Sequence, residues 1–171
     1  MKNLVALTLA MLLVASNAYA FGSKFKDEIA TETVAVKLVR DVAAGGYDLI
    51  TTAELAALKE SGEDILVIDT MPYEESYKKN HIPGAVQFLF PIPDMTTWND
   101  AETAGKSQED FLALLGPDKE KKIIVYCGFV KCTRSHNGAL WAKKLGYKNV
   151  YRYPGGIFAW KGADYEVATV K

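Results

Sequence analysis

Cysteine and histidine are scarce in this sequence, which has only two of each among its 171 residues. Zinc sites draw their ligands mainly from these residue types at characteristic spacings. Neither His81 nor His136 has partners at such a spacing. A domain of this length also does not need a disulfide framework of the kind that stabilises small secreted proteins. We therefore expect no metal site and no other cofactor.

An excess of charge of either sign is also missing. The chain has 20 Lys and Arg against 21 Asp and Glu, for a formal net charge of −1. Such a chain has no basic field that would attract nucleic acid or an anionic membrane. It contains no internal repeat and no low-complexity segment, and its length suits a single domain with a proper core.

Residues 1–20 have the features of a cleaved secretory signal. Lys2 is the only charge, an apolar run follows from Leu4 to Val14, and Ala18-Tyr19-Ala20 forms an A-x-A site before Phe21. The apolar run is too short to span a bilayer, so a membrane anchor is the weaker alternative. We predict cleavage after Ala20 and export, which in a bacterium means the periplasm, with no membrane attachment afterwards.

The rest of the chain divides into a helical extension and an α/β domain. Residues 21–46 have apolar residues at helical spacing and end at Gly45-Gly46; this helix either packs on the domain or pairs with another subunit. In residues 47–171, strand and helix patterns alternate. The predicted strands are 47–50, 65–69, 85–88, 123–126 and 150–153. This alternation predicts an open parallel sheet flanked by helices on both faces.

The chemistry is concentrated where the strand 123–126 ends. Cys127 follows this strand, and a small polar loop leads into a helical pattern at Ser135. The first N–H groups of a helix lack intrahelical partners and stabilise an anion such as a thiolate. Lys131 and Arg134 add positive charge to the same loop, and low-pKa thiols occur in surroundings of this kind. We therefore predict Cys127 to be a low-pKa nucleophile.

Several motifs in order resemble those of the rhodanese-like sulfurtransferases. They are Ile65 to Asp69 as a strand ending in Asp, Glu75 with Tyr77, His81-Ile82-Pro83-Gly84-Ala85, Tyr126-Cys127 followed by Arg134-Ser135, and Gly155-Gly156 with Trp160. The resemblance covers roughly residues 47–167. It implies the rhodanese-like fold and a reaction in which the cysteine takes a sulfane sulfur as a persulfide and passes it to a thiophilic acceptor.

The resemblance also implies roles for the loop residues. Cys127 would carry the sulfur, and Arg134 would close the ring of amides or bind the anionic donor. The remaining loop residues would form the cradle for the substrate: Gly128, Phe129, Val130, Lys131, Cys132, Thr133 and Ser135. The expected partners are a small sulfur-containing anion, a thiol acceptor and, in the alternative below, a partner redox protein.

The loop departs from the family's commonest form in its length. Six residues separate Cys127 from Arg134, where sulfurtransferases of the family usually have four. Cys132 resembles the second cysteine of an exported C-x4-C-x-x-S subgroup and could resolve a Cys127 persulfide by forming a disulfide. A structural bridge and a buried apolar filler remain open for Cys132. A thiol/disulfide redox protein and a non-catalytic binding module are therefore the alternative functions.

Two further segments leave alternatives open. Met71-Pro72 stands where the family usually has an Arg that pairs with a buried acid, so the salt bridging near Asp69 is in doubt. The irregular segment 89–98 either roofs a substrate pocket with Phe90, Met95 and Trp98 or uses these side chains to fill the core.

Overall fold

The computed structural model describes the backbone of residues 2–170 and the side chains of residues 24–170. The chain forms two compact units, residues 1–38 and 39–171. Helix α1 covers Lys2–Gly45. The predicted signal segment, residues 1–20, lies outside the part whose side chains are described. Within the described part, no helix is both long and apolar enough to cross a membrane.

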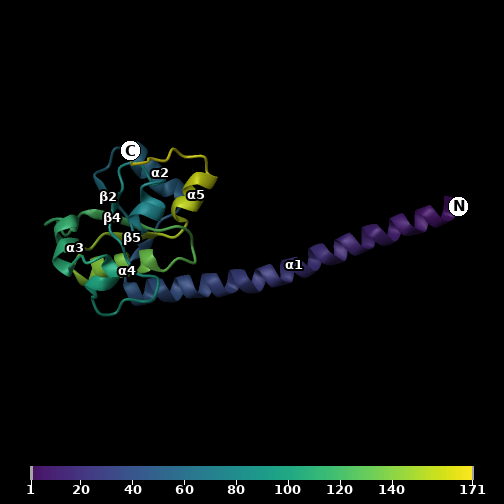
Figure 1. The fold of residues 1–171 in the computed structure, drawn as a ribbon, viewed down its shortest axis with the longest axis horizontal. Coiled ribbons are helices and arrows are strands. Elements are labelled where there is room, and N and C mark those ends of the chain that lie inside the picture. The colour runs from purple at the N-terminus through teal and green to yellow at the C-terminus, as the bar shows by residue number, and fades with distance from the viewer. Residues whose placement is uncertain (1, 171) are drawn as a thin grey trace. The chain divides into compact units, whose positions relative to one another are not determined.

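The second unit is built on a five-stranded parallel sheet (Figure 1). Its strands, in spatial order, are β1 (Asp48–Leu49), β5 (Val150–Tyr153), β4 (Lys122–Tyr126), β2 (Ile65–Asp69) and β3 (Val86–Gln87). All four pairings are parallel, and Asp69 of β2 lies opposite Tyr126 of β4. The predicted parallel sheet is confirmed, with β1 and β3 shorter than their sequence patterns indicated.

Two of the helices begin where the sequence provides side-chain caps. Helix α2 (Thr52–Glu60) and helix α3 (Gln108–Leu115) each start with a full capping box, from Thr51 and Ser107 respectively. Helix α4 (Arg134–Lys144) follows the loop after β4, and α5 (Gly156–Gly162) follows β5. A π-helical turn at Tyr73–Tyr77 and a 3-10 turn at Asp100–Thr103 complete the fold.

Separate apolar cores cover the two faces of the sheet. Ile68, Ile123 and Val125 face a core that includes side chains from α3 and α4. Val67 and Ile124, the alternate residues, face a core that includes side chains from α2 and α5. Because both faces are covered, the central strands are continuous apolar runs. The prediction of helices on both faces is therefore confirmed.

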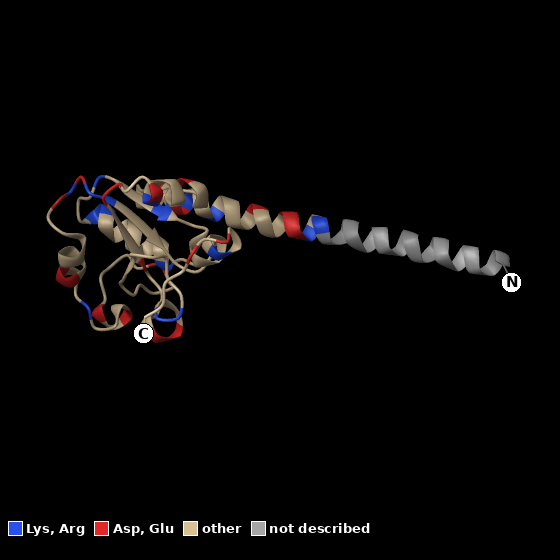
Figure 2. Cartoon of the chain, turned by 90° about the horizontal axis from the view of Figure 1, so that it is seen from above, with Lys and Arg blue, Asp and Glu red and all other residues tan. Residues whose placement is uncertain are grey.

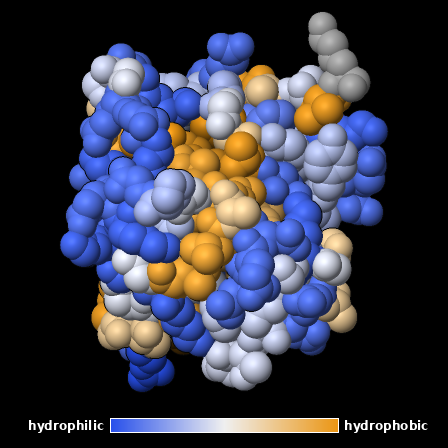
Figure 3. All heavy atoms as spheres, turned by 90° about the vertical axis from the view of Figure 1, so that its left-hand side faces the viewer, coloured by the Kyte–Doolittle hydropathy of each residue, from blue (hydrophilic) through white to orange (hydrophobic). Residues whose placement is uncertain are grey.

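The surface of the domain is polar and of mixed charge. Figure 2 shows acidic and basic side chains interspersed over the described part of the chain. Figure 3 shows one face on which hydrophilic residues border a central apolar area. In the described part of the chain, no region of one sign dominates the view in Figure 2, as the near-zero net charge leads one to expect.

The end of α1 belongs to the domain rather than to a separate extension. The compact unit begins at Val39, whereas the sequence pattern placed the boundary at Tyr47. Val42 packs against the core of α3 and α4, and Asp41 pairs with Arg152 of β5. The predicted boundary at Tyr47 rested on Gly45-Gly46, and α1 ends at Gly45.

Candidate active site

The loop of residues 127–133 lies at the carboxyl edge of the sheet. It leaves β4, which has β2 and β5 as neighbours, and enters α4 at Arg134. The start of α5 holds its first residues: the N–H groups of Ile157 and Phe158 donate to the carbonyls of Cys127 and Gly128, both at 3.0 Å. This edge is where ligands bind in open parallel sheets.

Cys127 is buried and surrounded by acceptors. Its side chain is 1% exposed, and its sulfur lies 3.2 Å from the Cys132 carbonyl oxygen and 3.9 Å from that of Phe129. Burial raises the pKa of the Cys127 thiol well above its ordinary value, and its hydrogen bond to the Cys132 sulfur raises it further. The predicted low pKa at Cys127 is therefore wrong, because the effect of burial exceeds that of the hydrogen bonds from the Ser135 hydroxyl and backbone N–H, which lower this pKa.

The amide groups of the loop instead serve Cys132. The pKa of Cys132 is lowered to about 6, although burial acts in the opposite direction. The largest effect that lowers this pKa is the hydrogen bond that the Cys127 thiol donates to the Cys132 sulfur. The backbone N–H groups of Arg134 and Gly128 also donate to this sulfur, and the charge of Arg134 acts in the same direction. Cys132 is partly exposed, and neither cysteine is in a disulfide. The loop therefore holds a buried thiol against a more accessible thiolate.

The other predicted cradle residues separate into two groups. Thr133 and Ser135 are buried, at 7% and 0% exposure, whereas Phe129, Val130 and Lys131 form the exposed tip of the loop. Gly128 contributes its amide to the Cys132 sulfur.

The Arg134 side chain makes a hydrogen bond outside the loop. Its guanidinium donates to the carbonyl of Phe90, so its hydrogen bond to the loop sulfur is made by its backbone N–H group. Its predicted role in binding the anionic donor stays a prediction.

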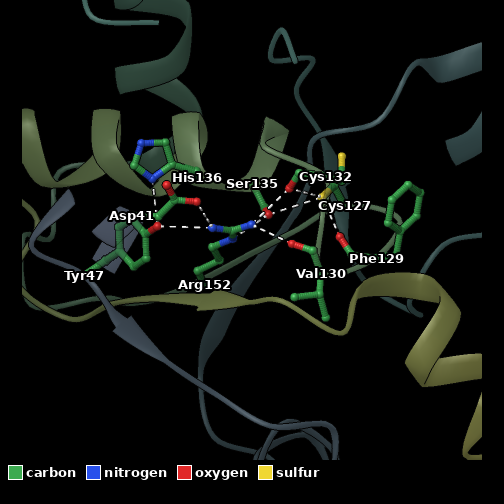
Figure 4. A network of polar contacts seen from close by, with 9 residues as sticks. All are labelled: Asp41, Tyr47, Cys127, Phe129, Val130, Cys132, Ser135, His136 and Arg152. Atoms are coloured by element: carbon green, nitrogen blue, oxygen red, sulfur yellow. Dashed lines mark hydrogen bonds and ion pairs between the residues drawn. The ribbon is translucent and has the colours of Figure 1, made fainter. Parts of the chain in front are cut away.

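The structure adds a residue that the sequence analysis did not single out, Arg152. It is 1% exposed and pairs with Asp41 at 3.0 Å. Its guanidinium also reaches the loop, where Nη2 donates to the carbonyls of Cys132 and Val130 at 3.0 and 3.3 Å. Figure 4 shows Arg152 between Asp41 on one side and the loop on the other. A charged residue within a strand of a sheet covered on both faces was the signal that could have identified it.

Asp69 is a second buried charge at this edge. Its side chain is 1% exposed, Oδ1 accepts the Met71 N–H at 2.8 Å, and the Tyr126 hydroxyl acts on the same carboxyl. Burial raises the pKa of this carboxyl to about 6. Met71 occupies the position of the family's usual Arg, so no guanidinium from that position compensates Asp69.

The segment 89–98 packs on α4 and fills the core. Asn137 Nδ2 donates to the carbonyls of Pro91 and Pro93, and Asn137 Oδ1 accepts the Met95 N–H. Phe90 and Met95 are 0% and 2% exposed, and Trp98 packs against the core partly buried. Among the described residues, no group of three or more His, Cys, Asp and Glu is placed to hold a metal ion.

Comparisons with known proteins agree with this architecture. The family model described as "Rhodanese-like domain" matches residues 51–163. An HTH-type transcriptional regulator of Mycobacterium tuberculosis is 32% identical over 74% of this chain and 47% of its own length. A protein of Mycolicibacterium smegmatis, named as a candidate thiosulfate sulfurtransferase, is 29% identical over 70% of this chain and 42% of its own.

Solved structures share the fold at lower identity. A thiosulfate sulfurtransferase of Pseudomonas aeruginosa superposes with a TM-score of 0.56 at 21% identity, over 76% of this chain and 22% of that one. This chain spans less than half the length of each of these three proteins.

Proposed function

Since this chain belongs to the rhodanese-like domain family, we propose that it is a sulfurtransferase that uses the thiol pair of its loop. It would move a sulfane sulfur from a thiosulfate-like or persulfide donor to a thiophilic acceptor. The observation that carries the proposal is the partly exposed Cys132 sulfur, which accepts hydrogen bonds from the Cys127 thiol and from the amides of Gly128 and Arg134. Such an environment stabilises a nucleophilic thiolate and, equally, an anionic persulfide.

The transfer consists of two displacements. The Cys132 thiolate attacks the outer sulfur of the donor, the donor's S–S bond breaks, and sulfite or a thiolate leaves with the electron pair. The acceptor then attacks the terminal sulfur of the Cys132 persulfide and regenerates the Cys132 thiolate. The competing arrangement, predicted from the sequence, places the persulfide on Cys127 instead.

The hydrogen bond between the two cysteines favours a thiol/disulfide function as the second candidate. Cys127 is placed to attack the inner sulfur of a Cys132 persulfide. This attack forms the Cys127–Cys132 bond, breaks the persulfide bond, and releases hydrosulfide, which carries off the Cys127 proton. A partner redox protein would then reduce the disulfide.

Peptide mapping after incubation with thiosulfate tests the proposal. Trypsin cleaves after Lys122, Lys131 and Arg134, so Cys127 and Cys132 fall in different peptides, residues 123–131 and 132–134. With thiols and persulfides blocked before digestion, we expect one added sulfur on peptide 132–134 in the full-length protein and in Cys127→Ser. Cys132→Ser should remain unlabelled.

The other outcomes identify the alternatives. Sulfur on peptide 123–131 alone would assign the persulfide to Cys127. A disulfide that forms without added sulfur would favour the redox function. A protein that forms neither a persulfide nor a disulfide would contradict both and leave a binding module.

Export belongs to the same proposal, on sequence grounds. The segment 1–20 has the charge, apolar run and cleavage site of a secretory signal, so the donor and acceptor would be encountered in the periplasm of a bacterial host. N-terminal sequencing of the protein from such a host should begin at Phe21. A mature chain that begins at Met1 would contradict export by cleavage.

A further inference from the structure

Arg152 contacts the loop 127–133 at two places and the start of α4 at a third, although it comes from a neighbouring strand. It donates to the carbonyls of Val130 and Cys132, and its Nε lies 3.0 Å from the Ser135 hydroxyl oxygen. The planar guanidinium makes these contacts and the Asp41 ion pair at the same time. The two carbonyls are thereby held in a fixed orientation, although loop carbonyls of this kind would otherwise be free to turn.

The contact with Ser135 fixes the direction of a hydrogen bond. An arginine has no acceptor, so Nε donates and the Ser135 oxygen must accept. The hydroxyl hydrogen of Ser135 is then available for its other close neighbour, the Cys127 sulfur at 3.2 Å. Donation from Ser135 lowers the pKa of Cys127 against the effect of burial.

We propose that Arg152 is a positioning residue of the loop: it orients the Ser135 hydroxyl toward the Cys127 sulfur and fixes the carbonyls of Val130 and Cys132. The ion pair with Asp41 compensates its charge and makes the end of α1 part of this arrangement. This proposal adds that Arg152 and Ser135 control when Cys127 can act as the second thiol. It rests on the proposed function in one respect only, which is that the loop thiols are the reacting groups.

Other charged and titratable groups also surround the thiols. On the Arg152 side, Tyr47 lies 3.4 Å from its Nη1 and 2.8 Å from Nδ1 of His136. On the other side, the two cysteines change each other's pKa, the charge of Arg134 lowers the pKa of Cys132, and the charge of Cys132 raises the pKa of Asp69. A test must therefore separate the Ser135 relay from the bare charge of Arg152.

The test is a pH titration of the Cys127 thiolate by its ultraviolet absorbance in a Cys132→Ser protein, with Cys127→Ser/Cys132→Ser as the blank. No sulfur donor is needed, so the result is independent of whether the proposed transfer occurs. We expect Arg152→Met to raise the pKa of Cys127 by about one unit, a tenfold loss of thiolate below that pKa. Ser135→Ala should do the same, and the double variant should add little more.

If Arg152→Met shifts the pKa of Cys127 equally in the presence and in the absence of Ser135→Ala, the charge of Arg152 acts directly and the proposal is overturned. The proposal is also overturned if Arg152→Met does not shift this pKa. If Arg152→Met does not fold, Arg152→Lys decides, since it retains the charge. One ammonium cannot make the guanidinium's simultaneous contacts, so positioning predicts that the raised pKa persists. An unchanged Cys127 pKa in Arg152→Lys would overturn the proposal.

Discussion

Gly156 lies against Gly128: a Cβ on Gly156 would come within 2.7 Å of the Gly128 carbonyl oxygen, and would overlap that of Cys127 as well. The backbone φ at Gly156 is +59°, which few side chains tolerate. The start of α5 can therefore approach the loop and donate to both carbonyls only because residue 156 has no side chain. The second glycine of the Gly155-Gly156 motif is a requirement of the active-site loop.

This relationship predicts that Gly156→Ala damages the loop. Left-handed backbone costs about 1 to 2 kcal/mol for a residue with a Cβ, and relieving the overlap requires the loop to move. We expect a lower melting temperature and a loss of thiosulfate-dependent labelling. Gly162→Ala on the same helix is the matched control, because a Cβ there meets no atom within 4 Å. Equal behaviour of the two variants would contradict the argument.

Cys132 should be the thiol that reacts at acidic pH. Its pKa of about 6 lies below its ordinary value because the Cys127 thiol and two backbone amides donate to its sulfur. The thiolate fraction, and with it the alkylation rate by iodoacetamide, should rise with pH through about 6 and level off above it. Mapping of peptides 132–134 and 123–131 measures both cysteines in one sample. A midpoint near 8.5, that of a free cysteine, would be inconsistent with the described loop.

The same arrangement predicts how Cys127 affects Cys132. Cys127→Ala removes the largest single effect that lowers the pKa of Cys132, so the midpoint of Cys132 alkylation should move to higher pH. Cys127→Ser retains a hydroxyl donor and should move it less. If both variants leave the midpoint at its original value, the hydrogen bond between the two cysteines does not control Cys132.

Asp69 should destabilise the protein at neutral pH. Its folded pKa of about 6 is raised above the ordinary 3.8, so its contribution is fully favourable only below the unfolded pKa and is lost as pH rises through 6. Asp69→Asn should therefore gain about 2 kcal/mol in unfolding free energy relative to the unsubstituted protein between pH 4.5 and 7.5. Urea denaturation at the two pH values measures this difference. A gain that does not depend on pH would rule out this role of the carboxyl.

Asp41 should stabilise the domain through Arg152. Asp41→Asn leaves a buried guanidinium without its charged partner, and we expect a loss of about 3 kcal/mol in urea denaturation. Asp64→Asn is the control, because Asp64 pairs with Lys121 on the surface with its side chain 90% exposed, and it should leave stability unchanged. A small effect of both variants would show that the end of α1 is not coupled to the loop through this pair.

The sequence by itself determined the fold and indicated which loop to consider as the candidate site. The alternation of short apolar runs with capped helices, such as those opened by Thr51 and Ser107, follows from local rules that operate within a few residues. For the same reason Cys127 could be placed at a strand end. The family motifs lie along the chain in an order that can be read without coordinates.

Only the tertiary structure decided which sulfur is stabilised as an anion and which charged residues surround it. Proximity to a helix N-terminus suggested Cys127, but the direction of each N–H and C=O in a seven-residue loop depends on what packs against it, here Arg152 and the start of α5. Asp41 and Arg152 are 111 residues apart, and no local pattern relates them. The pKa of a buried group depends on such distant neighbours, so it was set by the fold and not by the loop sequence.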